Sequence, residues 1–82
     1  MIKIVLEESL ERLGVSMRQL ALRAGLRPNT VTELTGNRAK QANFETLDKI
    51  LNAMNEIAEE RKLRVSFSIL DIISYEYIRK EE

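Results

Sequence analysis

Residues 16–34, SMRQLALRAGLRPNTVTEL, constrain the fold more than any other part of the sequence. Ser16 followed three residues later by Gln19 is a capping box, in which the hydroxyl and amide groups satisfy N–H groups at the start of a helix. We therefore expect a helix from residue 17. Gly25 favours the positive φ that ends a helix, and Pro28 is favoured in the first turn of the next one. The segment predicts two short helices joined by a tight turn.

The second of these helices has an apolar inner side and a polar outer side. Val31 and Leu34, one turn apart, are expected to pack on the first helix, where Ala21 is small enough for the two helices to cross closely. A helix of about seven residues is unstable alone, so its position depends on those contacts. Its outward side chains, which packing does not require, are Pro28, Asn29, Thr32 and Glu33.

Apolar residues at helical spacing predict two further helices that share one core. An apolar residue every three or four positions indicates a helix over about 5–13, which Gly14 ends. Asn43 is a good N-cap for a helix that extends to about residue 61. The buried stripe of that helix is expected to consist of Phe44, Leu47, Ile50, Leu51, Met54, Ile57 and Ala58.

The C-terminal third predicts a short helix and a strand. Ser68 and Asp71 repeat the cap pattern and indicate a fifth helix over about 69–73. Residues 1–5 and 75–78 alternate in the manner of strands. A single strand is not stable alone, so we expect the two segments to pair as a small antiparallel two-stranded ribbon. The alternative is that 75–78 pairs with its own copy across a dimer axis.

Composition excludes several classes of function. The 82 residues are 44% hydrophobic and 32% charged, as expected for one mainly α domain over residues 1–82. There is no cysteine and no histidine, which removes disulfides, the usual nucleophile–base pairs and the commonest zinc ligands. No carboxylate pair is predicted on an inward face, so we expect neither an enzyme nor a cofactor or metal. No apolar run approaches the roughly 20 residues that cross a bilayer, and a cytoplasmic location without membrane contact is the default expectation.

The charges are unevenly distributed although they sum to zero. Residues 16–41 contain five basic side chains and one acidic side chain, whereas residues 44–82 contain six basic and nine acidic ones. The five basic residues are Arg18, Arg23, Arg27, Arg38 and Lys40. A basic module of this kind suits a polyanionic partner such as nucleic acid. The alternative is an ordinary solvated surface.

Residues 16–34 resemble the helix-turn-helix of the Cro and phage-repressor family of bacterial DNA-binding regulators. The likeness is carried by the spacing of Leu20, Ala21, Gly25, Val31 and Leu34. It continues through TGNRAK and NFETLDKIL, similar to the family's loop and fourth helix, and through SILDIISYEY, similar to the ending of a branch of small regulators. The resemblance implies a five-helix lambda-repressor-like domain, with the helix-turn-helix at about 16–35, that binds double-stranded DNA.

The resemblance also implies roles for single residues. It places the outward residues Pro28, Asn29, Thr32 and Glu33 against base edges in the major groove. Asn29 suits adenine, Glu33 suits cytosine N4, and the Thr32 methyl suits a thymine methyl. Met17 and Pro28 stand at positions where polar residues are common in the family. Glu33 adds a negative charge to the surface that would face the bases. The alternative is that Glu33 forms an ion pair with Arg18 or Arg38 within the chain. Contacts to the DNA backbone are implied for Met17, Arg18, Arg27, Thr30, Asn37, Arg38 and Lys40.

A single short recognition helix reads few base pairs, so we expect a homodimer on two half-sites. The dimer surface is expected in a C-terminal element over about 62–80, at Phe67, Ile69, Ile73, Tyr75 and Tyr77. The alternative is that the two tyrosines cover the core of one chain. The expected function is a sequence-specific transcriptional regulator, with repression as the expected direction. The alternative function is an antitoxin-like module that binds a toxin or another protein and contacts DNA secondarily.

Overall fold

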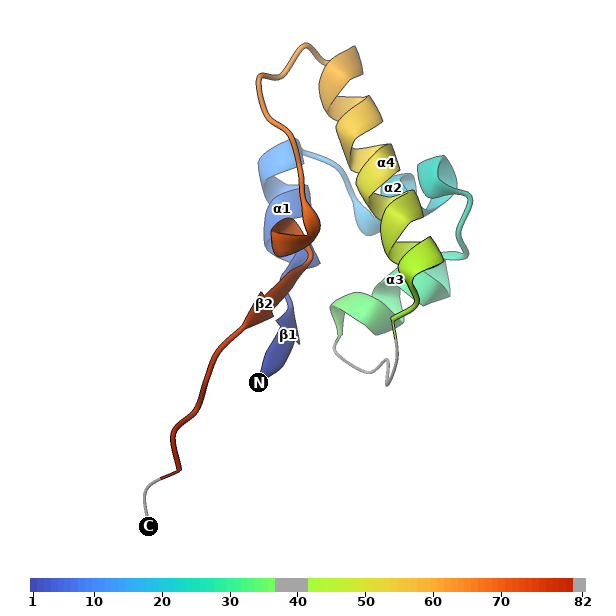
Figure 1. Cartoon of the computed structure of the whole chain (residues 1–82). Coiled ribbons are helices and arrows are strands. Elements are labelled where there is room, and N and C mark those ends of the chain that lie inside the picture. The colour runs from blue at the N-terminus through green and yellow to red at the C-terminus, as the bar shows by residue number, and fades with distance from the viewer. Residues whose placement is uncertain (37–41, 81–82) are drawn as a thin grey trace.

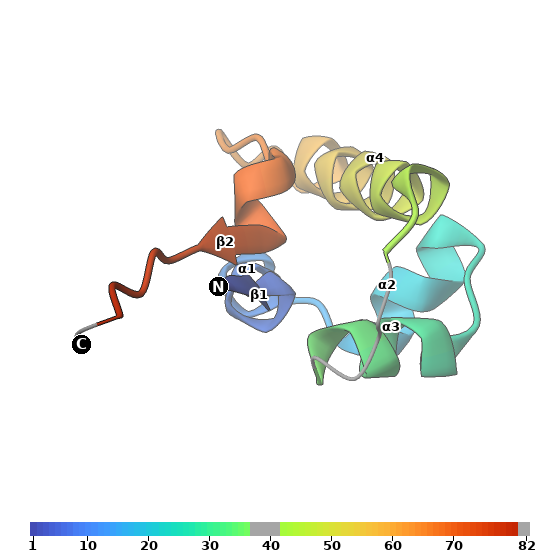
Figure 2. The same ribbon diagram turned by 60° about the horizontal axis from the view of Figure 1, so that its bottom comes forward.

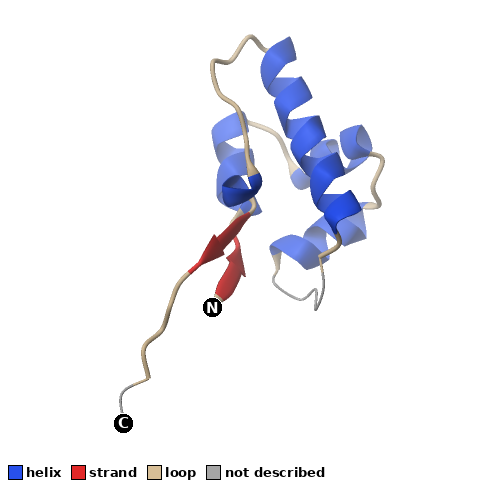
Figure 3. Ribbon diagram, viewed as in Figure 1, coloured by secondary structure: helices blue, strands red, loops and turns tan. Residues whose placement is uncertain are grey.

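The computed structural model describes residues 1–36 and 42–80, and these form four α-helices, one 3-10 turn and a two-stranded sheet (Figures 1 and 3). In chain order the elements are β1 (Ile2–Ile4), α1 (Leu6–Leu13), α2 (Met17–Ala24), α3 (Pro28–Thr35), α4 (Phe44–Glu60), the 3-10 turn η1 (Ile69–Asp71) and β2 (Ile73–Tyr75). α2 packs against both α3 and α4. The ribbon and η1 lie beside α1, away from α3 (Figure 2).

The helix ends follow the predicted caps. The Gln19 N–H donates to Ser16 Oγ over 3.1 Å, and the Ser16 N–H donates to Gln19 Oε1 over 2.9 Å, which is the predicted capping box. Asn43 caps α4 by accepting from the Thr46 N–H over 2.8 Å. Gly14 and Gly25 end α1 and α2 with φ values of 75° and 71°. These four local devices therefore fix where three of the helices begin or end.

One apolar core lies between α1, α2, α4 and the C-terminal segment. Its largest fully buried side chains are Leu6, Leu20, Val31, Ile50, Met54 and Ile72. All four helices contribute residues to this core. From the C-terminal segment, Ile72 belongs to the core and Ile73 packs against it. Because the core also includes Leu34, the orientation of α3 is determined by the same packing that stabilises the domain.

The C-terminal segment is attached to the helices by polar contacts. The Phe67 N–H donates to Asn55 Oδ1 over 2.7 Å, and Asn55 Nδ2 donates to the Phe67 carbonyl over 3.1 Å. Arg12 contacts Asp71 Oδ1 at 3.0 Å, and the Ser68 N–H donates to Asp71 Oδ2 over 2.8 Å. The Ser68 N–H, together with Arg12, lowers the pKa of Asp71 below its usual value.

The predicted ribbon between the two ends of the chain is confirmed. β1 and β2 are antiparallel, and Ile2 lies opposite Tyr75, Lys3 opposite Ser74 and Ile4 opposite Ile73. The strand at the C-terminal end occupies 73–75 rather than 75–78, so Tyr77 lies beyond it.

Two further details of the predicted fold are wrong. The described residues contain four α-helices, not five, because the segment predicted as a helix over 69–73 is a 3-10 turn that gives way to β2 at Ile73. Phe44, predicted in the buried stripe, is 89% exposed. It is the first residue of α4, so its side chain points past the helix start rather than over the core.

Candidate nucleic-acid interface

The outer face of α3 presents the four predicted base-reading side chains together. Pro28, Asn29, Thr32 and Glu33 are all exposed. Val31 is 0% exposed and Leu34 is 4% exposed, so the opposite face of the same helix is held in the core. α3 therefore presents a polar surface on a backbone that packing keeps in place, as a recognition element requires.

Hydroxyl groups orient two threonine side chains on α3. Thr32 Oγ1 donates to the Pro28 carbonyl over 3.0 Å, which occupies its hydroxyl within the helix and leaves its methyl group for outside contacts. Thr35 Oγ1 lies 3.0 Å from the Val31 carbonyl and 3.1 Å from Met17 Sδ. The second contact joins the end of α3 to the start of α2. Sequence reasoning missed Thr35, because the residue that it meets is 18 positions away.

The start of α2, the turn before α3 and the first turn of α3 contain the predicted phosphate-contacting residues that the structure describes. Arg18 and Arg27 are exposed and form no ion pair within residues 1–36 and 42–80. Met17 and Thr30 are half-buried, and the Thr30 N–H donates to the Arg27 carbonyl over 3.0 Å. The remaining predicted contacts, Asn37, Arg38 and Lys40, lie outside the described residues.

Arg23 belongs to a different surface from the other cations of this module. It pairs with Glu56 over 3.6 Å and also with Glu60, and both carboxylates are on α4. Its charge is therefore largely balanced within the chain. Glu33, in contrast, makes no ion pair with Arg18 or with any other described residue, and the second alternative partner, Arg38, lies outside the described residues.

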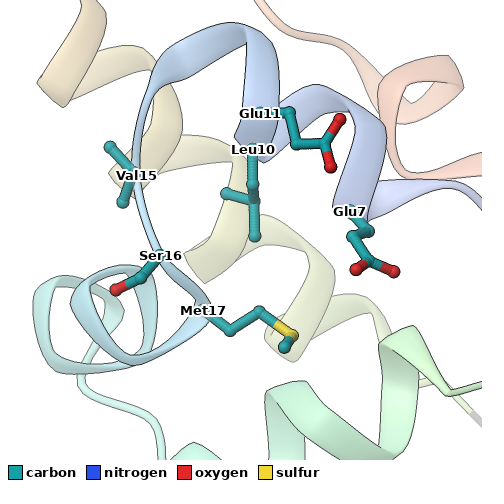
Figure 4. Close-up of a pocket in the computed structure, with 6 residues that line it drawn as sticks. All are labelled: Glu7, Leu10, Glu11, Val15, Ser16 and Met17. Carbon is teal, nitrogen blue, oxygen red and sulfur yellow. The ribbon is translucent and has the colours of Figure 1, made fainter.

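A pocket of about 240 Å³ lies beside the start of α2 (Figure 4). Glu7, Leu10 and Glu11 reach it from α1, whereas Val15, Ser16 and Met17 reach it from the turn and the first residue of α2. Neither Glu7 nor Glu11 forms an ion pair with another described residue. Two carboxylates therefore border the helix end that is predicted to approach phosphate, and they oppose the approach of any polyanion.

Comparison with known protein families identifies the module. The Cro/C1-type HTH DNA-binding domain matches residues 5–60, which run from the start of α1 to the end of α4. The chain belongs to this family of helix-turn-helix DNA-binding proteins. Neither a curated protein nor a solved structure matches it significantly.

The described ranges contain neither a metal-binding cluster of side chains nor a helix able to span a membrane. No group of three or more Asp and Glu side chains in residues 1–36 and 42–80 is arranged to hold a metal ion. No helix in that part of the chain is long and apolar enough to cross a membrane.

Proposed function

We propose that the protein is a sequence-specific regulator of transcription that inserts α3 into the major groove of double-stranded DNA. The proposal rests on the outer face of α3, where polar side chains are exposed on a helix that is anchored in the core. Asn29 and Glu33 are exposed and make no side-chain hydrogen bond or ion pair with the described residues, while Val31 and Leu34 anchor the helix in the core. Polar groups that are unpaired yet held at a fixed angle are suited to bonding with base edges.

Each residue of this face suits a particular base contact. The Asn29 amide matches the N6 and N7 groups of adenine, and the Glu33 carboxylate accepts from cytosine N4. Thr32 offers its methyl group to thymine, because its hydroxyl already donates to the Pro28 carbonyl. Pro28 adds an apolar contact at the helix start. Glu33 also repels phosphate, so it lowers affinity for sequences that do not place cytosine opposite it.

Contacts to the DNA backbone are proposed on both sides of α3. The first group lies at the start of α2 and consists of Met17, Arg18 and the N-terminal N–H groups of that helix. The second group lies at the start of α3 and consists of Arg27 and Thr30. We extend the same role to Asn37, Arg38 and Lys40 in the segment that follows α3. These contacts set the position of the helix on the duplex and provide salt-dependent affinity, without selecting a sequence.

We propose further that the protein binds as a homodimer. One small module buries roughly 600–1,000 Å² on DNA, which supports limited affinity and reads few base pairs. A two-fold dimer contacts two half-sites about one helical turn apart and thus predicts a palindromic operator. Repression is the proposed direction, because a protein that occupies a promoter blocks it without needing a further activating contact.

A second candidate is an antitoxin-like module whose main partner is another protein. The exposed apolar residues of the C-terminal segment favour it, since Leu70 is 77% exposed and Tyr77 is 75% exposed. This function predicts a stable complex with an unrelated chain from the host. Purification of the tagged protein from its host, followed by mass spectrometry, should return such a chain in fixed stoichiometry if the module is an antitoxin.

Selection of bound duplexes from a random pool tests the proposed DNA binding. The expected result is a palindromic consensus that includes adenine or cytosine at the positions facing α3. Asn29→Ala should relax preference at one position of each half-site, whereas Arg27→Ala should weaken all duplexes alike and reduce the salt dependence by about one phosphate contact. Recovery of unenriched sequences at low salt, where binding is strongest, would refute the proposed function.

A further inference from the structure

Met17 places a thioether at the end of α2 that is proposed to approach phosphate. It is the first residue of this helix, and its side chain is half-buried and packs against the core. A thioether carries no charge and cannot donate a hydrogen bond to phosphate. Charge and hydrogen-bond donors at this helix end come instead from Arg18 and the first N–H groups of α2. The proposed contacts with DNA therefore make no use of the sulfur atom.

The Met17 side chain can be reached by small molecules from outside. It lines the pocket of about 240 Å³ beside the start of α2, and Figure 4 shows its thioether extending into the space bordered by Leu10 and Glu7. A molecule of liquid water occupies about 30 Å³, so this pocket also admits a molecule as small as hydrogen peroxide. Met54, in contrast, is 0% exposed. Met17 therefore combines access for a small oxidant with a fixed place in the fold.

The sulfur atom also joins the two helices of the proposed DNA interface. Thr35 Oγ1, at the end of α3, lies 3.1 Å from Met17 Sδ, at the start of α2. The same hydroxyl lies 3.0 Å from the carbonyl of Val31, which anchors α3 in the core. The contact thus connects the helix end beside phosphate with the helix that faces the bases. A chemical change at this sulfur acts on both helices.

We propose that Met17 is an oxidation site through which hydrogen peroxide weakens DNA binding. A lone pair of Met17 Sδ attacks one oxygen of the peroxide and the O–O bond breaks. The proton on the oxygen now bonded to sulfur moves to the departing hydroxide, which leaves as water. The sulfur loses two electrons and becomes a sulfoxide, while the peroxide is reduced. Methionine sulfoxide reductases reverse this modification, so it can act as a switch.

The sulfoxide weakens DNA binding for two reasons. Its oxygen carries a partial negative charge and only accepts hydrogen bonds, so it repels phosphate and adds to the negative potential of Glu7 and Glu11 in the same pocket. Oxidation also makes polar a side chain that packs against the apolar core, which disturbs this packing and the contact with Thr35. Both effects act at the start of α2, where the duplex backbone is proposed to lie.

Mass spectrometry after treatment with hydrogen peroxide tests the site without DNA. Cleavage after lysine and arginine separates Met17, in residues 13–18, from Met54, in residues 50–61. Met17 should be oxidised at least about tenfold faster than the fully buried Met54. The matched reference is Leu22→Met, which adds a methionine to the same helix at a position where the side chain is 68% exposed, and Met17 should react within about tenfold of it. A smaller ratio to Met54 would overturn the proposal.

Fluorescence anisotropy on the selected operator tests the effect on binding, with each protein compared with its own untreated sample. Peroxide should weaken binding by the wild-type protein at least about fivefold. Met17→Leu has a side chain of similar volume without sulfur and keeps Met1 and Met54, so its affinity should change by less than about twofold. The reductases for both sulfoxide epimers, supplied with dithiothreitol, should restore the treated wild-type protein. An equal loss in both proteins would contradict the assignment to Met17.

This inference rests on the proposed function for its effect on DNA but not for the modification itself. The melting temperature needs no DNA, and treatment should lower it by about 3 °C or more in the wild-type protein and by less in Met17→Leu. Rapid oxidation of Met17 in a protein that selects no duplex would remove the proposed function and leave the site intact. Selection of an operator by a protein whose Met17 reacts as slowly as Met54 would remove the site and leave the function intact.

Discussion

Replacing Val31 by alanine tests whether the core holds α3 in place. Val31 is 0% exposed, and the substitution removes two buried carbon atoms. At about 0.8 kcal/mol for each buried CH₂-sized group, the transfer contribution is about 1.6 kcal/mol, and the cavity left behind raises the total to about 2–3 kcal/mol. A domain of this length has a free energy of unfolding of roughly 4–12 kcal/mol. The variant should therefore stay folded at 25 °C with a clearly lower stability.

The matched control is Leu22→Ala on the neighbouring helix. It removes three carbon atoms, one more than Val31→Ala, from a side chain that is 68% exposed. Its expected cost is within about 0.5 kcal/mol. Urea denaturation followed by circular dichroism gives the free energy of unfolding of both variants, and the melting temperature of Val31→Ala should fall by roughly 10–20 °C. A loss for Leu22→Ala that equals the loss for Val31→Ala would refute the assignment of α3 to the core.

Two further substitutions test single charges. Asp71→Asn should lower the free energy of unfolding at pH 7, and this deficit should shrink below about pH 4. The pKa of Asp71 is lower in the folded than in the unfolded chain. The stability that the carboxylate provides is therefore present above the unfolded pKa and is lost as the pH falls through the folded pKa. Denaturation curves at pH 7 and pH 3 measure this, and a deficit that grows in acid would contradict it. Glu11→Gln removes a negative charge near the start of α2. It should raise the affinity for specific and for random duplexes alike by roughly twofold to fivefold. The control Glu59→Gln, near the end of α4, should change these two affinities less. Fluorescence anisotropy at low salt gives both affinities, and equal effects would show that the pocket carboxylates lie away from the DNA.

Local sequence signals predicted the helix-turn-helix because its determinants are close in the chain. The Ser16–Gln19 box spans four residues, and a left-handed glycine such as Gly25 needs only its own backbone conformation. The packing of Val31 and Leu34 follows from their spacing within one short helix. The predicted recognition face therefore has the exposure expected of it, although its contacts with bases remain predictions.

The errors come from features that periodicity does not describe. Phe44 matches the helical spacing of the buried stripe, but spacing does not show that the first residue of a helix lies beyond the core. Arg23 counted as a free cation in the sequence, yet the fold brings it to two glutamates more than 30 positions away. Phe67 was predicted at a dimer surface, but it is 9% exposed and hydrogen-bonds through its backbone to Asn55, so it belongs to the core of one chain.

The other residues predicted at the dimer surface differ in exposure. Ile69 is 43% exposed, Tyr75 is 65% exposed and Tyr77 is 75% exposed, whereas Ile73 is half-buried. The alternative prediction that the two tyrosines cover the core of a single chain is therefore wrong. Their alternating pattern indicated a strand but did not indicate its partner, and the partner of 73–75 proved to be the N-terminal strand of the same chain.

The charges around α3 make dimerisation important for affinity. Arg18 and Arg27 are the described cations without an ion pair on this side of the molecule, and Glu7, Glu11 and Glu33 form no ion pair with another described residue. These carboxylates offset the two described cations, so Arg18 and Arg27 alone give one copy little affinity from phosphate neutralisation. A second copy on the same duplex doubles the contacts and acts at a high effective concentration. Operator affinity should therefore depend on the assembly of two copies on the same duplex.

This coupling predicts the shape of the binding curve. Where free protein is mainly monomeric, operator occupancy should rise with about the square of the protein concentration, because two chains must assemble on the site. On a duplex that carries a single half-site, the same protein should bind with a simple hyperbolic curve and a lower affinity, because no second chain assembles there. Fluorescence anisotropy on the two duplexes gives both curves. Curves of equal steepness on the full operator and on the half-site would show that assembly of two chains does not contribute to operator binding.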